Sequence, residues 1–285
     1  MVHEAPLGEE FDWAFTTWHR NGLKKYPHLG TFCWSSIEFA KRGIGCTPNL
    51  PDAHTFIHET GHLMGLNDYY DYFNKNESLA GGSIMQDNNI CDHDPMSKYL
   101  YGWTTPTIVT DKNKEETIEI ELRPFESSGD TLLLAPAFND TSLDEYILME
   151  YYTPTGINEF DSKTTYEACP GLTEPGIKIW HCDKRVYQAY LHTEGSGINR
   201  TVTTYFDPNA SEDPDILNCP ETEGKLPADG KDYYAMFSTN TSEDYGPDKF
   251  YITPELELLR HREVKPGQTE HANAVNEDMW KAGDK

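Results

Sequence analysis

The sequence has no long hydrophobic run. Its longest uninterrupted aliphatic stretch is Leu132 to Ala135, far short of the roughly 20 apolar residues that a membrane-spanning helix needs. The first residues, Met1 to Pro6, are polar and lack the apolar segment of a secretory signal peptide. The chain therefore predicts no membrane span, and its N-terminus taken alone predicts a cytoplasmic protein.

Positive charge is also scarce. The 285 residues include 23 Lys and Arg against 48 Asp and Glu, which gives a formal net charge of −25. A protein that binds nucleic acid or an anionic membrane surface needs a basic face, so this balance argues against both kinds of partner. The acidic excess favours solubility, and clustered carboxylates can hold Ca²⁺, which makes calcium a second expected ion.

Cysteine pairs at metal-binding spacing are absent. The six cysteines are widely separated and none forms a Cys-x-x-Cys pair, which argues against the common structural zinc sites. An even number suits up to three disulfides in an oxidising compartment, and scattered reduced thiols are the alternative. The spacing favours neither state and defines no pairing.

What the chain does contain is the run His58-Glu59-Thr60-Gly61-His62. Two histidines four positions apart lie on one face of a helix, one turn from each other, so both imidazoles can reach a single metal ion. The glutamate beside the first histidine can then face the metal-bound water. The flanking residues are mostly apolar, which predicts a largely buried helix whose polar groups need a partner. The run predicts a Zn²⁺ site with Glu59 as general base.

The helix that carries this run is expected to extend from Pro51 to Gly65, with Asp52 as its N-cap. Gly65 ends it, because glycine readily takes the left-handed conformation that closes helices. A sharp turn there can bring Asp68 to the metal, and two imidazoles with one carboxylate leave a fourth position open for water. Asp71 is the competing third ligand, and either aspartate can instead orient a histidine. Coordination logic favours Asp68.

The run from His58 to Asp68 resembles the long zinc signature of the metzincin-type metallopeptidases, in their aspartate variant. Later segments narrow the resemblance to the immune inhibitor A-type secreted metallopeptidases. These segments are Gly81 to Asp87, similar to a methionine-turn stretch; Ser97 to Trp103, similar to the following helix; and Glu145 to Tyr152 and Gly176 to Asp183, similar to the later β-rich region. The resemblance covers the chain from about Asp52 to about Val186.

The resemblance implies a zinc-dependent endopeptidase that acts on proteins or peptides and is secreted or at the cell surface. His58, His62 and Asp68 would hold Zn²⁺, and Glu59 would take a proton from the attacking water and return it to the leaving amine. A methionine would pack beneath the site without taking part in the chemistry. Met85 is the expected one, and Met96 is the alternative.

Two other functions are compatible with the motif. Only 57 residues precede His58, whereas metzincin-type domains normally build a substrate-lining sheet before the zinc helix. Part of that upstream region is therefore expected to be missing, and such a fragment can be a catalytically impaired zinc-binding module that serves as a surface or binding protein. The second rival is another zinc hydrolase, such as an amidase, against which the extension from Gly65 to Asp68 argues.

The residue that would stabilise the tetrahedral oxyanion is not decided by spacing. Tyr99, Tyr101 and His93 are the candidates. His93 stands between Asp92 and Asp94, so it can instead belong to a calcium site or to a solvated loop, and the solvated loop is the more ordinary reading.

The sequence predicts an α+β fold in two parts. Residues 1–105 are expected to form a zincin- or metzincin-like peptidase domain that is incomplete at its N-terminus. Residues 106–262 are expected to form a β-rich, sandwich-like module, and residues 263–285, with few apolar side chains, a loose tail. Expected strands, from alternation and flanking turn residues, are Thr117 to Leu122, Leu132 to Phe138, Tyr146 to Tyr152, Ile177 to His181 and Val202 to Phe206. The sequence fixes neither the oligomeric state nor the cleavage specificity.

Overall fold

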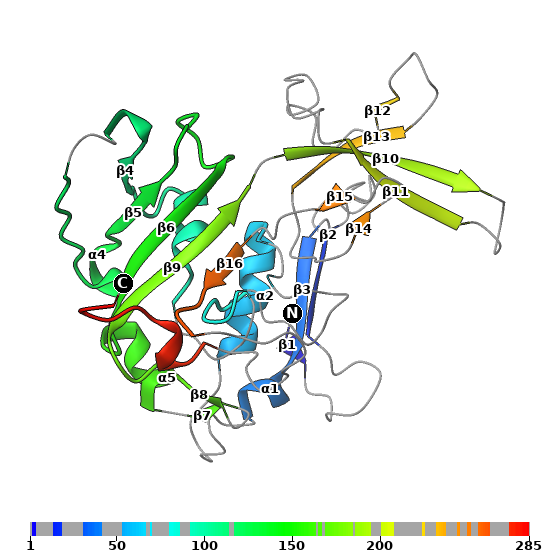
Figure 1. The fold of residues 1–285 in the computed structure, drawn as a ribbon. Helices are drawn as coiled ribbons and strands as arrows, with labels where there is room; N and C mark the ends of the chain where they lie inside the picture. Colours follow the sequence, from blue (N-terminus) through cyan, green and yellow to red (C-terminus); the bar gives the residue numbers. More distant parts are fainter. Residues whose placement is uncertain are drawn as a thin grey trace.

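The computed structural model gives a mixed α/β protein with a five-stranded mixed sheet (Figure 1). The described residues are 2–3, 14–18, 31–41, 53–66, 69, 80–85, 92–113, 117–163, 165–166, 169–184, 186–194, 201–207, 224–225, 232–237, 244–245, 250–251, 256–262 and 274–284.

The five-stranded sheet has the order β16-β9-β6-β5-β4. Its strands are β4 (Thr107–Val109), β5 (Thr131–Leu134), β6 (Glu145–Tyr152), β9 (Gly176–Asp183) and β16 (Leu256–Leu259). Neighbours are antiparallel except β4 and β5, which are parallel. The sheet is therefore mixed, whereas a purely antiparallel arrangement would suit the expected sandwich.

The two long central strands build much of the core. Burial alternates along β6 and β9, as period-two side chains of a half-buried sheet require. Leu148 and Trp180 are opposite each other in the ladder, and both are fully buried. The same apolar cluster includes Met85 and Met96 from the region of the motif, and Met279 from near the C-terminus. One core thus joins residues on both sides of the expected boundary at residue 105.

A smaller sheet precedes the motif in the chain. In the described part of the first 57 residues, β1 (Val2–His3), β2 (Phe15–Trp18) and β3 (Thr31–Ser36) form a sheet of order β1-β3-β2, followed by α1 (Ile37–Lys41). The helix α2 (His54–Met64) packs on β2 and β3. Figure 1 shows α2 between this sheet and the five-stranded sheet.

The ends of α2 agree only in part with expectation. The N-cap residue is Ala53, which provides no side-chain hydrogen bond, so the expected cap at Asp52 is wrong. At the other end Gly65 has φ 103° and closes the helix, as predicted. The backbone N–H of Gly65 donates to His62 O at 2.9 Å, and that of Leu66 donates to Gly61 O at 3.1 Å. This pair of bonds is the Schellman closure that a left-handed glycine permits.

A buried turn and a short helix follow α2 in the described part of the chain. Residues 80–85 form a turn that is buried throughout, and Met85 O accepts from the backbone N–H of Tyr69 at 2.9 Å. The helix α3 (Pro95–Leu100) then begins with Asp94 as N-cap and Pro95 at its first position, both favourable at a helix start. A helix is therefore present where Ser97 to Trp103 resembles one, but it begins two residues earlier, at Pro95, and ends at Leu100.

The remaining strands form smaller sheets. An antiparallel sheet of order β11-β10-β13-β12 contains β10 (Val186–Glu194), β11 (Thr201–Asp207), β12 (Gly224–Lys225) and β13 (Asp232–Phe237). Two short pairs are β7 (Thr165–Tyr166) with β8 (Cys169–Pro170), and β14 (Asp244–Tyr245) with β15 (Phe250–Tyr251). The short helices are α4 (Phe125–Ser128) and α5 (Glu159–Lys163), with 3-10 turns Asp111–Asn113, Gly156–Asn158 and Asn276–Asp278.

Most of the expected strands are present. The predictions over Tyr146 to Tyr152, Ile177 to His181 and Val202 to Phe206 are confirmed, and Leu132 to Phe138 is confirmed over its first half by β5. The prediction over Thr117 to Leu122 is wrong, since these residues form no strand. Their apolar members are not buried, and Ile118 is 40% exposed. The alternation of apolar and polar residues in this segment is therefore not accompanied by a strand, because its apolar side chains have no core to pack against.

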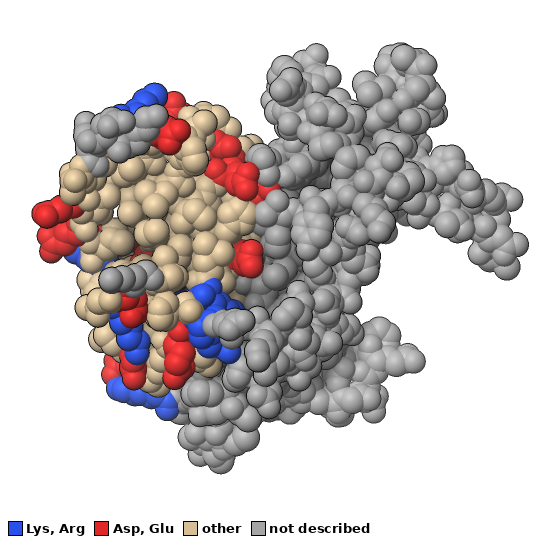
Figure 2. Space-filling view, viewed as in Figure 1, with Lys and Arg blue, Asp and Glu red and all other residues tan. Residues whose placement is uncertain are grey.

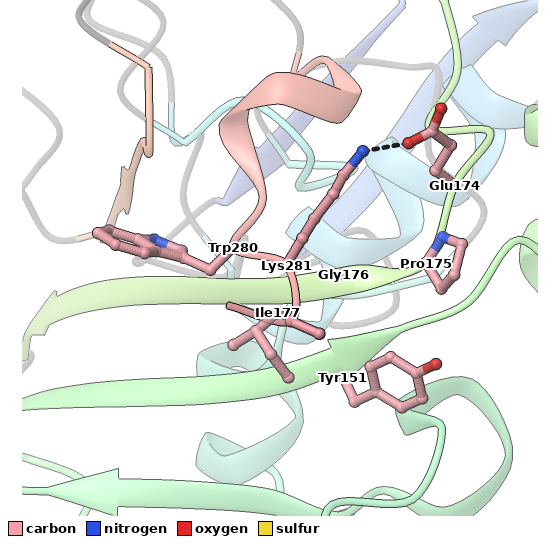
Figure 3. Close-up of a pocket in the computed structure, with 8 residues that line it drawn as sticks. Tyr151, Glu174, Pro175, Gly176, Ile177, Trp280 and Lys281 are labelled. Atoms are coloured by element: carbon pink, nitrogen blue, oxygen red, sulfur yellow. Dashed lines mark hydrogen bonds and ion pairs between the residues drawn. The ribbon is translucent and has the colours of Figure 1, made fainter. Parts of the chain in front are cut away.

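The C-terminal segment differs from the expected loose tail over residues 274–284. Met279 is buried in the core, and Trp280 exchanges two backbone hydrogen bonds of 2.9 Å with Ile177. The carboxylate of Asp278, also fully buried, accepts from Arg260 and Arg262. A hollow of about 660 Å³ lies beside this segment and is lined in part by Tyr151. Figure 3 shows its lining residues, which include Trp280 and Lys281. An ion pair between Lys281 and Glu174 lies at the hollow, and none of its lining residues comes from α2.

On the described part of the visible face, the acidic side chains do not form one continuous patch (Figure 2). Figure 2 shows the carboxylates in separate groups over the described part of the chain, with several basic side chains near the lower edge. No helix in the described ranges is long and apolar enough to span a bilayer.

Candidate metal centre

The two histidines of the motif converge at their Nε2 atoms. His58 and His62 are both buried on α2, and their Nε2 atoms are 3.1 Å apart. The rings are nearly perpendicular, with an interplanar angle of 88° and centroids 4.7 Å apart. The one-turn spacing expected from the sequence therefore brings the two imidazoles edge to face.

The hydrogen bonds at the opposite ring atoms identify the tautomers. His58 Nδ1 lies 2.8 Å from Ile84 O, and His62 Nδ1 lies 2.8 Å from Leu66 O. A carbonyl oxygen only accepts, so each Nδ1 must carry the hydrogen. In a neutral ring this leaves Nε2 with its lone pair. Two lone pairs at 3.1 Å repel each other unless a proton or a cation lies between them.

This donor set fits Zn²⁺. Two Zn–N bonds of about 2.05 Å at a tetrahedral angle would place the two nitrogens about 3.3 Å apart, close to the separation found. Metal-bound histidines commonly donate their other N–H to a carbonyl or a carboxylate, which fixes the ring and the tautomer. The two imidazoles could therefore serve as ligands of one ion, and the described residues do not include a third ligand beside them.

The two orienting carbonyls come from different turns. Leu66 O belongs to the turn at Gly65 that closes α2, so the helix stop also orients His62. Ile84 O belongs to the buried turn of residues 80–85. The sequence marked both turns by their glycines, but it gave no sign that their carbonyl groups would face the histidines.

Glu59 occupies the next position on α2 and is 6% exposed. Its Oε2 accepts a hydrogen bond of 2.7 Å from the hydroxyl of Thr16 in β2. The same hydroxyl lies 3.0 Å from the backbone carbonyl of Glu59. Thr16 is 43 positions upstream and belongs to no recognisable motif, so sequence reasoning missed it. No local signal could have identified it, because the contact depends on how β2 packs on α2.

Met85 lies directly beneath α2, as expected for the methionine under the site. It is fully buried, and a Cβ placed on Gly61 would be only 2.5 Å from its sulfur. The absence of a side chain at Gly61, between Glu59 and His62 in the motif, is what allows this approach. Met96, the alternative, is also buried in the core, but Met85 is the methionine in contact with α2.

Asp94 ties the turn beneath α2 to α3. Its carboxylate accepts from Ser83 Oγ at 2.7 Å, from Ser97 Oγ at 2.9 Å and from the backbone N–H of Ser97 at 2.8 Å. Ser83 Oγ in turn accepts from the backbone N–H of Met85 at 3.2 Å. One buried carboxylate thus caps a helix and holds the turn whose carbonyl group, that of Ile84, orients His58.

A buried ion pair lies behind this turn, on the five-stranded sheet. Lys178 Nζ is 3.2 Å from Glu150 Oε1, and both side chains are at most 4% exposed. Trp180 Nε1 donates to the same oxygen at 3.0 Å, and the ammonium lies 4.7 Å from the centre of the Tyr152 ring. Burial raises the pKa of Glu150, while the charge of Lys178 acts in the opposite direction.

A third histidine of α2 holds the helix from another side. His54 Nε2 lies 2.6 Å from Asp161 Oδ1 in α5, and both side chains are buried. His54 stands one turn before His58, so the printed sequence does contain a stripe of three histidines at four-residue spacing. Its partner is 107 positions away, however, and nothing near Asp161 marks it.

The three oxyanion candidates have different surroundings. The hydroxyl of Tyr101 donates to Met64 O at 2.6 Å, and Tyr99 packs against the core with its ring 6.0 Å from that of Tyr146. Burial lowers the pKa of His93, the charge of Asp94 acts in the opposite direction, and the charges of Lys98 and His58 lower that pKa further. His93 Nδ1 is buried and has no hydrogen-bond partner in the described part of the chain. The oxyanion donor stays a prediction.

Both candidate third ligands, Asp68 and Asp71, lie outside the described residues. The described ranges contain no group of three His, Cys, Asp or Glu side chains placed to hold an ion. For calcium, the carboxylate of Asp92 is paired with Lys98 at 2.6 Å and that of Asp94 is used as described above. A calcium site therefore stays a prediction.

The cysteines leave their pairing open. Cys46, Cys91 and Cys219 lie outside the described residues. The disulfide expectation accordingly stays a prediction.

Comparison with protein-family models, with curated proteins and with solved structures found no match to this chain.

Proposed function

We propose that the protein is a zinc-dependent endopeptidase of the metzincin type, similar to the immune inhibitor A-type secreted metallopeptidases. The observation that carries the proposal is the convergence of two imidazoles, each oriented by a carbonyl group, with their Nε2 atoms 3.1 Å apart. Supporting it are the adjacent buried Glu59, Met85 beneath Gly61, and the left-handed stop at Gly65. The resemblance also favours secretion or a cell-surface location, with proteins or peptides as substrates.

In this proposal four side chains have two separate roles. His58, His62 and Asp68 hold Zn²⁺, which when bound polarises the scissile carbonyl and acidifies a water molecule. Glu59, whose carboxylate is adjacent to the first ligand, takes the proton from the attacking water and delivers it to the leaving amine. The burial of Glu59 and of both imidazoles limits competing water around the groups that exchange the proton.

The first prediction tests the general base. Glu59→Gln should keep bound zinc, because the substitution spares both imidazoles, yet casein hydrolysis should fall about 100- to 10,000-fold with the loss of the base. His58→Ala should lose the metal, as elemental analysis would detect, and wild-type hydrolysis should stop on addition of a chelator.

A matched control lies on the same helix. His54→Gln removes an imidazole but keeps a donor for Asp161, so it should retain zinc and hydrolysis. Hydrolysis that persists in Glu59→Gln or in the presence of the chelator would overturn the proposal. Zinc binding with no hydrolysis of any protein or peptide by the wild-type chain would support the binding module instead.

A further inference from the structure

The hydroxyl of Thr16 contacts the side chain that would act as general base. Its Oγ1 is 2.7 Å from Glu59 Oε2, the usual length for a hydroxyl that donates to an oxygen, and 3.0 Å from Glu59 O. A hydroxyl has one hydrogen to donate. The shorter contact and the charge of the carboxylate favour donation to Oε2, since hydrogen bonds to charged acceptors are the stronger ones.

The strand that carries Thr16 is itself held in place. β2 pairs with β3 in an antiparallel ladder in which Thr16 is opposite Cys33, and both strands pack on α2. Threonine is branched at Cβ, which restricts its first side-chain torsion. Thr16 is therefore a donor with little freedom, fixed to a sheet that rests on the helix of the motif.

We propose that Thr16 is a positioning residue for Glu59. This inference rests on the proposed peptidase function. With Oε2 engaged by the hydroxyl, rotation of the carboxylate is limited and Oε1 is the oxygen left for proton exchange with water. A long glutamate side chain that lost this bond would sample other rotamers, and small misplacements of a reacting group reduce turnover steeply.

The direction of the effect separates positioning from a change in basicity. A donor on a carboxylate weakens it as a base, so if Thr16 acted only in this way its removal would increase turnover. Positioning predicts the reverse. Thr16→Val, which replaces the hydroxyl by a methyl group of similar size, should lower kcat about 10- to 100-fold and leave KM unchanged.

The experiment compares zinc-loaded variants of the full chain on one peptide substrate. Thr16→Ser keeps the hydroxyl and should retain kcat within about threefold of wild type. Thr17→Val makes the same change at the next position of β2 and should leave kcat unchanged. Zinc content, measured for each variant, should equal that of wild type, which distinguishes misplacement of Glu59 from loss of the site.

A double substitution tests whether Thr16 acts through Glu59. In the Glu59→Gln background, Thr16→Val should cause no further loss, because two residues that act as a unit are not additive. An active wild type with unchanged kcat in Thr16→Val, or a further loss in the double variant, would overturn this inference alone. A wild-type chain without chelator-sensitive hydrolysis would overturn the proposed function and this inference with it.

Discussion

Two charged side chains, Glu150 and Lys178, are buried side by side under the candidate site. Taking charges out of water is costly, and the cost is offset here by their mutual attraction, by the indole N–H of Trp180 and by the ring of Tyr152. Removing one partner should destabilise the protein more than removing both, because the single charge that remains is buried without an opposite charge beside it.

Lys178→Met should therefore lower the free energy of unfolding by about 3–5 kcal/mol near neutral pH. The double variant Glu150→Gln/Lys178→Met should lose much less, since it leaves no buried charge and the new amide oxygen can still accept from Trp180. Urea unfolding of both variants measures the difference. Equal losses in the two variants would show that the ion pair is not what stabilises this position.

The loss in Lys178→Met should also depend on pH. Burial raises the pKa of folded Glu150 above its ordinary value of 4.5. As the pH rises above 4.5, Glu150 loses its carboxyl proton in the unfolded chain before it does so in the folded protein. The contribution of Glu150 to stability therefore falls with increasing pH. Without Lys178 the pKa rises further, and the deficit relative to wild type should be larger at about pH 8 than at about pH 5. A deficit that shrinks with increasing pH would contradict this assignment.

At the level of elements, α3 and the turn of residues 80–85 act as one support for α2. Asp94 joins them, because its two oxygens serve both the start of α3 and Ser83. The turn then presents Ile84 O to His58. The orientation of the His58 ring thus depends on a helix cap that acts on it through the turn of residues 80–85.

Asp94→Ala should weaken zinc binding about 10- to 100-fold, the usual effect of losing a group that supports a ligand. It should also cost about 1–2 kcal/mol of stability from the lost cap. Asp94→Asn keeps an oxygen for the backbone N–H of Ser97 and should lose less of both. Competition with a chromogenic chelator measures the affinity, and unchanged affinity in Asp94→Ala would show that the turn holds its position without this carboxylate.

The features near α2 were predictable to different degrees. Its stop at Gly65, the placement of His58 and His62 on one face and the burial of Met85 follow from local spacing and from the family resemblance. The roles of Thr16, Asp94 and Asp161 around α2 were not predictable, because each depends on tertiary packing. The same limit explains Thr117 to Leu122, where an alternating pattern has no partner strand among the described residues.

On the scale of the molecule, α2 is held from several sides. β2 and β3 pack on it, Met85 lies beneath Gly61, and His54 contacts Asp161. The chain's far end also joins the common core through residues 274–284. Met96, Trp180 and Met279, one from each of the three expected parts, belong to the same apolar cluster.

Met279→Ala distinguishes a docked C-terminal segment from a loose one. A docked segment should lose about 2–5 kcal/mol of unfolding free energy, because a fully buried methionine leaves a cavity. Lys281→Ala, at a partly exposed position two residues on, should change stability by about 0.5 kcal/mol or less. Thermal or urea unfolding gives both values, and a negligible effect of Met279→Ala would restore the loose-tail prediction.

The contact between Met85 and Gly61 also bears on how the protein ages. Oxidation of Met85 would add an oxygen atom to its sulfur and make the side chain polar. The tight contact under α2 has no space for the added oxygen, and the apolar core would not solvate it. Met64, on the same helix, is 38% exposed and open to peroxide. Oxidation should therefore spare Met85 while residues 80–85 stay packed under α2. Met85 should be oxidised only when that packing is transiently lost. Once oxidised, Met85 could no longer fit where it was, so brief exposure would become lasting damage to the candidate metal centre.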